Sequence, residues 1–411
     1  MPRSSSSSPA SLDEIRAEQL RRLRLGLPEV LRQNRFWRER LHDVRGWDDF
    51  ERLPLLTKDE LVRDQAATPP FGTNLTRPLA QFIRLHQTSG SSGAQPLRWL
   101  DTPESWAWWV RIWADHVYAA AGVTAADRVF LAFSFGPFIG FWSAFGGAAE
   151  VGALTISGGA MGSEQRLRTI ADLGATVLLC TPTYALRLAE SARDLGLDAA
   201  ALPLRVTIHA GEPGASIPAT RTAIEDAFAA TAFDHTGMTE LGPTGHSCAQ
   251  RDGVHLIESE FIFETLPSGE LVATNLGRWG MPLFRYRTGD RVELSREPCS
   301  CGSAFVKVRG GVQGRVDDMF TVRGVNVFPS QVEDVIRRRP GITEFQIQLG
   351  RVRGLDEATL LVEGEGAEAA LARLGADLRQ ALGVRLECRA VGAGTLPRPE
   401  MKARRLVKLD V

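Results

Sequence analysis

Between residues 104 and 235 the chain alternates helical patterns with short apolar runs. The apolar runs are five residues long, and they lie at Val129–Phe133, Ala153–Ser157, Thr176–Cys180 and Arg205–His209. Short apolar strands separated by helices are typical of βα units. The pattern therefore predicts a mainly parallel sheet. Because ligands bind beyond the carboxyl ends of such strands, the turns of small residues that follow the runs are the expected ligand edge.

The pattern changes twice towards the C-terminus. From Val254 to Leu294, apolar and polar residues alternate and Gly and Pro interrupt them, which predicts a β-rich subdomain. After residue 316, about 95 residues hold strand patterns near Phe345–Leu349, Thr359–Glu363 and Val384–Val391, and a helix near Glu368–Leu382. We therefore predict an α/β fold with a large N-terminal domain (residues 1–316), which has mainly parallel sheets plus a β-rich subdomain, and a small mobile α+β C-terminal lid domain (residues 317–411).

The charge balance excludes several classes of partner. The 48 Lys and Arg residues nearly balance the 49 Asp and Glu residues, so no global field attracts nucleic acid or an anionic membrane. A small phosphorylated ligand held by a local site is favoured instead. No apolar run approaches the roughly 20 residues that span a bilayer, and the start of the chain is polar and Ser-rich. We expect a cytoplasmic enzyme.

Residues 314–333, GRVDDMFTVRGVNVFPSQVE, form the predicted junction between the two domains. Arg315, Asp317 and Asp318 precede an alternating strand at Met319–Arg323, and Ser330 is predicted to cap a helix that stops at Pro340. This order resembles the hinge of adenylate-forming enzymes, the acyl-CoA synthetase superfamily. The run RGVNVFPSQVE resembles the phenylacetate-CoA ligase family within it. The resemblance extends from about Leu12 to Lys402.

The resemblance implies an ATP site made of several segments. A loop of hydroxyl residues and glycines can surround a polyphosphate with N–H and O–H groups, although such loops are most often flexible turns. Here it lies where the family has its phosphate loop, with Pro96 matching and Gln95 replacing the common Lys. The loop residues are Thr88, Ser89, Gly90, Ser91, Ser92 and Gly93.

Asp234–Glu240, DHTGMTE, resembles the superfamily motif in which a Thr meets the α-phosphate and a Glu holds Mg²⁺. The resemblance gives these roles to Thr239 and Glu240, and adds Asp234, His235 and Thr236 to the ATP site. Thr236 stands where the family has Tyr. The alternative is that Thr239 merely caps a helix and leaves Glu240 exposed.

Three further segments complete the implied nucleotide site. Arg285–Asp290, RYRTGD, resembles the element whose aspartate binds the ribose, and Arg315 would reach the ribose or a phosphate. Ala210–Pro213 matches the loop beside the adenine, which adds Gly211, Glu212 and Pro213. A tight turn would also place a Gly there.

Lys402 follows a Leu-Pro-Arg run that resembles the family's mobile catalytic loop, although Met401 replaces the usual glycine. A cation delivered there stabilises the negative charge that gathers on phosphorus during adenylation. The resemblance makes Asp317 the hinge about which the lid turns. The expected catalytic residues are Lys402, Thr239 and Glu240.

Four further residues suit a metal ion. Cys248, His255, Cys299 and Cys301 supply ligands appropriate to tetrahedral zinc, and with no open position such a zinc would be structural. Buried free thiols are the alternative. A subset of the phenylacetate-CoA ligase family carries a similar set.

Aromatic residues indicate the class of acid. Phe135, Phe138, Phe141 and Trp142 lie in the segment that lines the acyl pocket of related enzymes, and core packing is the alternative explanation. The expected substrate pocket is Phe135, Phe138, Phe141, Ala210, His235 and Gly237.

We therefore expect a ligase that converts an aromatic carboxylic acid and Mg·ATP to an aryl-AMP with release of pyrophosphate, then transfers the aryl group to a thiol, by family default that of coenzyme A. A carrier protein, an amine, or nitrogen chemistry on an aminoaryl acid remain open, as does a homodimer. The departures at Gln95, Thr236 and Met401 keep a non-enzymatic nucleotide-binding scaffold open as well.

Overall fold

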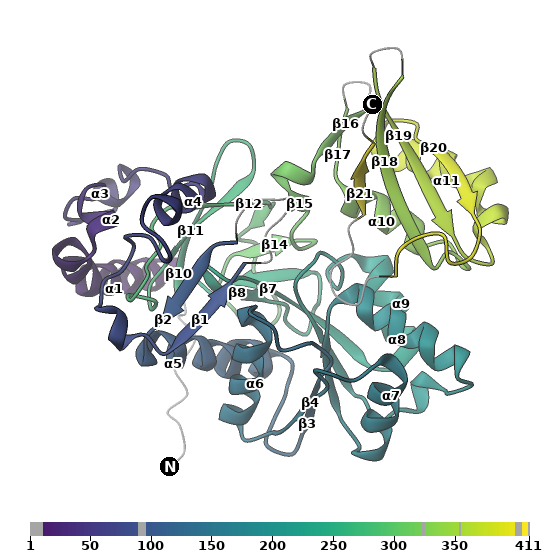
Figure 1. Cartoon of the computed structure of the whole chain (residues 1–411), viewed down its shortest axis with the longest axis horizontal. Coiled ribbons are helices and arrows are strands. Elements are labelled where there is room, and N and C mark those ends of the chain that lie inside the picture. The colour runs from purple at the N-terminus through teal and green to yellow at the C-terminus, as the bar shows by residue number, and fades with distance from the viewer. Residues whose placement is uncertain (1–10, 89–95, 323–324, 353–354, 399–404, 410–411) are drawn as a thin grey trace. The chain divides into compact units, whose positions relative to one another are not determined.

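The computed structural model describes residues 11–88, 96–322, 325–352, 355–398 and 405–409 (Figure 1). The chain divides into two compact units. The first contains Met1–Gly159 and His235–Arg309, and the second contains Ala160–Asp234 and Gly310–Val411. Each unit is described by itself below. The expected domain boundary between residues 316 and 317 stays a prediction.

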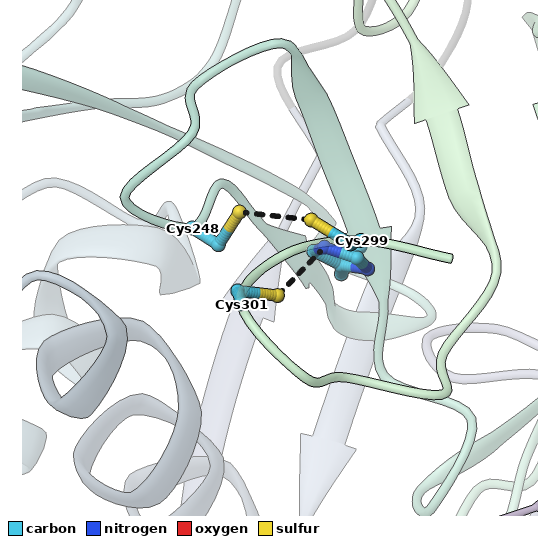
Figure 2. A group of neighbouring side chains, drawn as sticks. Cys248, Cys299 and Cys301 are labelled. Carbon is cyan, nitrogen blue, oxygen red and sulfur yellow. Dashed lines mark hydrogen bonds between the residues drawn. The ribbon is translucent and has the colours of Figure 1, made fainter. Parts of the chain in front are cut away.

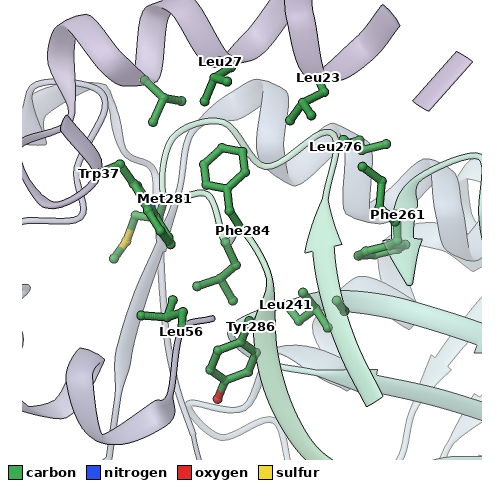
Figure 3. Packing of buried hydrophobic residues seen from close by; sticks show 14 of the residues in the cluster. Leu23, Leu27, Trp37, Leu56, Leu241, Phe261, Leu276, Met281, Phe284 and Tyr286 are labelled. Carbon is green, nitrogen blue, oxygen red and sulfur yellow. The ribbon is translucent and has the colours of Figure 1, made fainter. Parts of the chain in front are cut away.

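The first unit begins with four helices: α1 (Leu12–Gln33), α2 (Arg35–Arg38), α3 (Trp47–Glu51) and α4 (Lys58–Ala67). Ser11 caps α1, because its hydroxyl accepts the Glu14 N–H at 3.2 Å. The apolar face of α1, with Leu23 and Leu27, packs on a buried cluster that includes Trp37 and Phe284 (Figure 3). Tyr286, Leu241 and Leu276 belong to the same cluster, so this core supports the segments with candidate chemistry.

A hairpin and a short parallel pair follow. The 3₁₀ turn Leu79–Gln81 leads into β1 (Arg84–Gln87), which pairs antiparallel with β2 (Arg98–Asp101). Helix α5 (Pro103–Ile112) continues as a π-helix over Trp113–Tyr118. Strands β3 (Arg128–Leu131) and β4 (Leu154–Ser157) then run parallel, joined by α6 (Ile139–Val151). The predicted apolar runs are thus strands, each one residue or more shorter than expected.

The predicted β-rich subdomain is confirmed in the first unit. Strands β7 (Thr231–Met238), β8 (Gly242–His246), β9 (Gly253–Leu256), β14 (Lys307–Arg309) and β13 (Leu294–Ser295) pair antiparallel in this order. A second antiparallel sheet contains β10 (Phe261–Thr265), β11 (Glu270–Asn275) and β12 (Tyr286–Arg291). The carboxyl end of β7 and the start of β12 carry two of the predicted motifs.

The second unit contains the remaining βα elements. Strand β5 (Val177–Cys180) is parallel to β6 (Val206–His209), and β6 is parallel to the first half of β7. The helices are α7 (Ser163–Asp172), α8 (Pro182–Asp194), the 3₁₀ turn Ala199–Ala201 and α9 (Pro218–Phe228). Both predicted strands are confirmed.

The C-terminal part of the second unit is an α+β structure, as predicted. It starts with β15 (Gly314–Arg315), the 3₁₀ turn Val316–Asp318, and the paired strands β16 (Phe320–Val322) and β17 (Val325–Val327). Helices α10 (Pro329–Arg337) and α11 (Ala367–Leu382) share a buried core with the sheet. The order in that sheet is β20 (Glu387–Val391), β19 (Leu355–Glu363), β18 (Glu344–Val352) and β21 (Leu406–Lys408).

Ser330 does not cap α10, so that prediction was wrong. The helix begins at Pro329, because proline lacks an N–H and its fixed φ suits the first turn. The Gln331 side chain accepts the Phe328 N–H at 3.0 Å, and the Ser330 hydroxyl donates to the Gln313 carbonyl instead. Among the described residues, no helix combines the length and the apolar character needed to cross a membrane.

Candidate active site and metal centre

Thr239 and Glu240 lie in the turn between β7 and β8, and no helix begins there. The alternative of a helix cap with an exposed glutamate is therefore wrong, because Glu240 is 6% exposed. The Tyr286 hydroxyl donates to the Glu240 carboxylate at 2.9 Å, and Tyr286 is itself buried. This hydrogen bond joins the DHTGMTE and RYRTGD segments directly.

Two residues that the sequence analysis did not single out hold the backbone of the same turn. The Arg278 guanidinium donates to the Thr239 carbonyl at 2.6 Å, and the Asn275 amide donates to the Leu241 carbonyl at 3.1 Å. Both belong to the run TNLGR that precedes RYRTGD. In the sequence, these two residues could have been noticed because polar residues stand just before the RYRTGD motif, within an otherwise apolar stretch.

Upstream of the turn, Gly237 has no room for a side chain. A Cβ atom at this position would lie 2.9 Å from the Gly242 carbonyl oxygen and 3.3 Å from His235 Nε2. The neighbouring Thr236 hydroxyl lies 3.1 Å from the Thr244 hydroxyl across the strand pair. Glycine at 237 is therefore required by the close approach of β8, whatever its role towards a substrate.

His235 is buried, and its tautomer follows from its partner. Nδ1 lies 2.8 Å from the Gly245 carbonyl, which can only accept, so Nδ1 carries the proton and Nε2 is an acceptor. Burial lowers the pKa of His235 to about 4, against the effect of this hydrogen bond. The ring packs on Trp113 of the π-helix, with 4.3 Å between centroids. His235 is thus neutral at physiological pH.

Asp290 lies in a bend that β12 fixes. The Thr288 hydroxyl donates to the Leu271 carbonyl at 2.9 Å and accepts the Asp290 N–H at 3.1 Å. Gly289 has a φ of 75°, and its N–H donates to the Glu270 carboxylate at 3.2 Å. The bend leaves Asp290 half-buried.

Thr88 is the part of the predicted phosphate loop that the structure describes. It exchanges hydrogen bonds with Leu97: its N–H donates to the Leu97 carbonyl, and its hydroxyl accepts the Leu97 N–H, both at 3.0 Å. These bonds bring the two ends of the loop together at the end of the β1–β2 hairpin where the loop joins the strands. Ser89, Gly90, Ser91, Ser92 and Gly93 lie outside the described residues.

In the second unit, the predicted adenine-side residues lie in one loop, Ala210–Pro213. The Glu212 carboxylate accepts the Thr183 N–H at 2.9 Å at the start of α8. Asp234 accepts the Ser216 N–H at 3.0 Å and the Ser216 hydroxyl. Asp234 therefore anchors the end of this loop, and its contact with the nucleotide stays a prediction.

The junction and the approach to Lys402 are also in the second unit. Arg315 and Asp317 are paired at 2.9 Å. Lys402 lies outside the described residues, but the segment before it is anchored. The buried Glu363 carboxylate accepts N–H groups from Gly394 at 2.9 Å, from Leu396 at 2.7 Å and from Arg398 at 2.6 Å.

The predicted aromatic residues are brought together around the start of α6. Phe135 contacts Trp142 edge-on at 4.8 Å and Phe145 at 5.8 Å, and Phe141 stacks on Phe133. The Trp142 indole N–H donates to the Gly136 carbonyl at 3.0 Å. Phe138 is half-buried at the N-terminal end of α6. Phe135, Phe138 and Phe141 are all only partly buried, so core packing leaves part of each side chain exposed.

The four predicted metal ligands converge in the first unit (Figure 2). Their ligand atoms all lie within 4.8 Å of one another. The sulfurs of Cys248 and Cys299 are 3.7 Å apart, and the Cys301 sulfur is 3.4 Å from His255 Nε2. Zinc–sulfur bonds of about 2.3 Å in a tetrahedron place sulfurs about 3.8 Å apart, so the spacing fits zinc.

The other nitrogen of His255 supports the same assignment. Nδ1 donates to the Phe305 carbonyl at 3.1 Å, which leaves Nε2 directed at the cysteines, as outer hydrogen bonds usually orient a metal-binding histidine. His255 is also the cross-strand partner of His246, which is the cross-strand partner of His235. The three histidines therefore lie in a row across β9, β8 and β7.

The sequence and the fold resemble known ligases. Residues 324–409 match the family model described as the AMP-binding enzyme C-terminal domain. The phenylacetate-coenzyme A ligase of Thermus thermophilus is 32% identical in an alignment that covers 85% of this chain and 82% of that protein. The phenylacetate-coenzyme A ligase of Escherichia coli (strain K12) is 31% identical in an alignment that covers 97% of this chain and 96% of that protein.

A solved structure agrees with these relatives. The 2-hydroxyisobutyryl-CoA ligase in its postadenylation state, in complex with R3-HIB-AMP, has a TM-score of 0.91 and 27% identity, covering 98% of this chain and 91% of that one. Both the mixed α/β architecture and the order of the motifs are therefore those of adenylate-forming enzymes. The chain belongs to the phenylacetate-CoA ligase family of AMP-forming acid–CoA ligases.

Proposed function

We propose that this enzyme adenylates an aromatic carboxylic acid with Mg·ATP and transfers the aryl group to coenzyme A. The acid's carboxylate attacks the α-phosphorus, pyrophosphate leaves, and the thiol sulfur then displaces AMP from the aryl-AMP. The observation that carries the proposal is the hydrogen bond from Tyr286 to Glu240, which joins two motifs that would otherwise be unrelated stretches of sequence.

We assign Glu240 to magnesium and Thr239 to the α-phosphate. A hard cation needs oxygen ligands, and Mg²⁺ commonly takes one or two carboxylates plus substrate phosphates. Glu240 is buried, and Tyr286 fixes one of its oxygens, so the carboxylate is oriented before the nucleotide binds. Such pre-organisation favours a role in binding Mg·ATP over a role as a solvated surface group.

Asp290 would accept the ribose hydroxyls, Arg315 would reach the ribose or a phosphate, and the Ala210–Pro213 loop would flank the adenine. Lys402 would neutralise charge on the α-phosphate during adenylation, and Asp317 would be the pivot that withdraws it before the thiol step. The Glu363 carboxylate accepts hydrogen bonds from Leu396 and Arg398, which fixes the part of the chain that precedes Lys402 and supports this role.

Two features favour an aromatic acid. Phe135, Phe138 and Phe141 are partly exposed aromatic residues in one segment, and flat rings pack well on one another. His235 offers a neutral imidazole beside Trp113, which suits the recognition of a ring substituent. The relatives above 30% identity are named for phenylacetate, whereas the solved neighbour acts on an aliphatic hydroxy acid.

The test is pyrophosphate exchange with Mg·ATP and a panel of acids. The panel contains phenylacetic, benzoic and amino-hydroxybenzoic acids, with 2-hydroxyisobutyric acid as the aliphatic comparison. We expect exchange with at least one aromatic acid and a product of aryl-CoA mass when coenzyme A is present. Exchange with the aliphatic acid alone would overturn the aromatic assignment. An acyl-AMP that coenzyme A does not consume would point to a carrier protein or an amine.

We also propose that Cys248, His255, Cys299 and Cys301 hold one structural zinc ion. The sulfur spacing and the hydrogen bond that orients His255 support this assignment. Because all four positions of the tetrahedron would be taken by protein ligands, the ion would have no open position for substrate or water. It would fix the β8–β9 hairpin to the segment around Cys299.

A further inference from the structure

Arg278 is a fully buried cation in the first unit. Its side chain is 0% exposed, and its guanidinium lies over the rings of Trp99 and Trp109, 5.7 and 5.0 Å from their centroids. A buried charge is tolerated only when it is paired and its donors are satisfied. Asp101 accepts from Nε and Nη2, both at 2.7 Å, in the bidentate geometry that Arg and a carboxylate prefer.

The third nitrogen of the Arg278 guanidinium, Nη1, has a different partner. Nη1 donates to the Thr239 carbonyl at 2.6 Å. Because the guanidinium is planar and its other two nitrogens are held by Asp101, the direction of Nη1 is fixed. The Thr239 carbonyl is therefore held by a rigid donor, and the peptide that joins Thr239 to Glu240 is oriented with it.

Asp101 connects this donor to a second candidate segment. It is the last residue of β2, where it pairs with Arg84, whereas Gln87 and Arg98 pair at the other end of the hairpin. The Ser/Gly loop joins the strands at that other end, next to the Thr88–Leu97 hydrogen bonds. The ion pair thus ties the base of the hairpin that carries the predicted phosphate loop to the turn that carries Thr239 and Glu240.

The turn is held at three consecutive residues. Arg278 holds the Thr239 carbonyl, Tyr286 holds the Glu240 carboxylate, and Asn275 holds the Leu241 carbonyl. All three donors come from residues 275–286. Arg278 alone also reaches the β1–β2 hairpin, through Asp101. Its loss would let the turn and the hairpin move relative to each other.

We propose that Arg278 and Asp101 are positioning residues for the adenylation half-reaction. The pair sets the orientation of the Thr239–Glu240 turn relative to the phosphate-loop hairpin, and both segments face Mg·ATP in the function proposed above, on which this inference rests. Neither residue touches the substrate. Pyrophosphate has left before the thiol step, whereas the acyl-AMP keeps the α-phosphate that Thr239 would contact. The loss of the pair therefore slows adenylation more than it slows thioester formation.

The test uses variants that avoid leaving a lone buried charge. Replacing both partners of a buried ion pair with apolar residues of similar size is often neutral for stability, so the main variant is Asp101→Leu with Arg278→Met. Arg278→Lys is the second variant, because it keeps the charge but loses the planar fork. Arg22→Met is the control, since it removes a part-buried arginine that pairs with Glu260 at 2.8 Å and donates to the Leu276 carbonyl at 2.9 Å. It therefore perturbs the same segment as Arg278 without removing a hydrogen bond to Thr239, Glu240 or Leu241.

Each full-length variant is measured for pyrophosphate exchange, for thioester formation from supplied acyl-AMP and coenzyme A, and for its melting temperature. We expect the exchange kcat/KM for Mg·ATP to fall at least about tenfold in both Arg278 variants, because small misplacements of catalytic groups cost up to about 10²-fold. We expect a smaller loss in thioester formation than in exchange. The Arg22→Met control matches the wild type in both half-reactions.

Two results would overturn the proposal. One is wild-type exchange in the double variant, and the other is an equal loss in both half-reactions, which is the result of a merely structural role. If the double variant does not fold, the test rests on Arg278→Lys. The proposal then fails unless this variant loses more activity in exchange than in thioester formation. A wild-type enzyme without exchange on any acid would instead contradict the proposed function.

Discussion

Removal of the Tyr286 hydroxyl is the most direct test of the Glu240 assignment. Tyr286→Phe deletes one hydrogen bond of 2.9 Å between two buried groups. The phenylalanine ring fills the same place in the core, where Tyr286 packs with Leu56, Leu241 and Phe284 (Figure 3). The change therefore creates no large cavity, and its main effect is on the orientation of the Glu240 carboxylate.

The magnitude follows from the type of bond. Hydrogen bonds to charged groups contribute about 1.5–3 kcal/mol, and each 1.4 kcal/mol corresponds to about a factor of ten. We therefore expect kcat/KM for Mg·ATP in pyrophosphate exchange to fall about 10- to 100-fold, and the Mg²⁺ concentration for half-maximal rate to rise. The assay is exchange over a Mg²⁺ titration, with the melting temperature measured in parallel.

Tyr118→Phe is the matched control. Tyr118 is also buried, and its hydroxyl donates to the Ala144 carbonyl at 2.8 Å, without contact to Glu240. The control reports what the loss of a buried tyrosine hydroxyl does by itself. If Tyr286→Phe shows the same Mg²⁺ dependence as Tyr118→Phe, the reasoning that Tyr286 orients a magnesium ligand is wrong.

Three further outcomes are expected. Elemental analysis should find about one zinc per chain. Cys299→Ser should lose the zinc and melt at a lower temperature, whereas the control Cys388→Ser, at a half-buried cysteine outside the cluster, should do neither. A wild-type protein purified without metal would contradict the assignment. Lys402→Ala should slow adenylation by at least about 10²-fold while thioester formation from supplied acyl-AMP persists; equal losses refute the role. Burial raises the pKa of Glu363, but the Leu396 and Gly394 N–H groups and Arg398 outweigh it, so its pKa lies below 4.5. The carboxylate then stabilises the fold above that pH, and Glu363→Gln should lower the melting temperature at pH 7 by an amount that shrinks as the pH falls below 4.5; a pH-independent difference excludes this account.

The strands of the βα region were predictable because a buried parallel strand needs a continuous apolar run. The runs at Val129–Phe133 and Val177–Cys180 meet that need, and the structure contains β3 and β5 there. The π-helix at Trp113–Tyr118 was not predictable. Over six residues, its repeat differs too little from that of an α-helix for side-chain pattern to separate them.

The convergence of Cys248, His255, Cys299 and Cys301 was predictable because Cys and His have few other reasons to gather in one stretch. The role of Arg278 was harder to predict, since in a sequence a buried arginine resembles the many solvated ones. Its place in a polar run beside the RYRTGD motif was a hint, but its ion pair with Asp101, 177 residues away, is seen only in the structure. Asp234 shows a further limit of the sequence. Its motif indicates contact with the nucleotide, which stays a prediction, whereas its hydrogen bonds to Ser216 depend on how the loop after β6 folds back.

The zinc ion proposed above would also protect the cysteine cluster from oxidation. Cys248 and Cys299 hold their sulfurs 3.7 Å apart, about 1.7 Å more than the length of a disulfide bond (Figure 2). An oxidant acting on the stripped protein would then join β8's end to the segment beyond β13 covalently. Such a bond would consume two of the four ligands and prevent the ion from returning. Stripping with a chelator is therefore reversible only while a reductant is present.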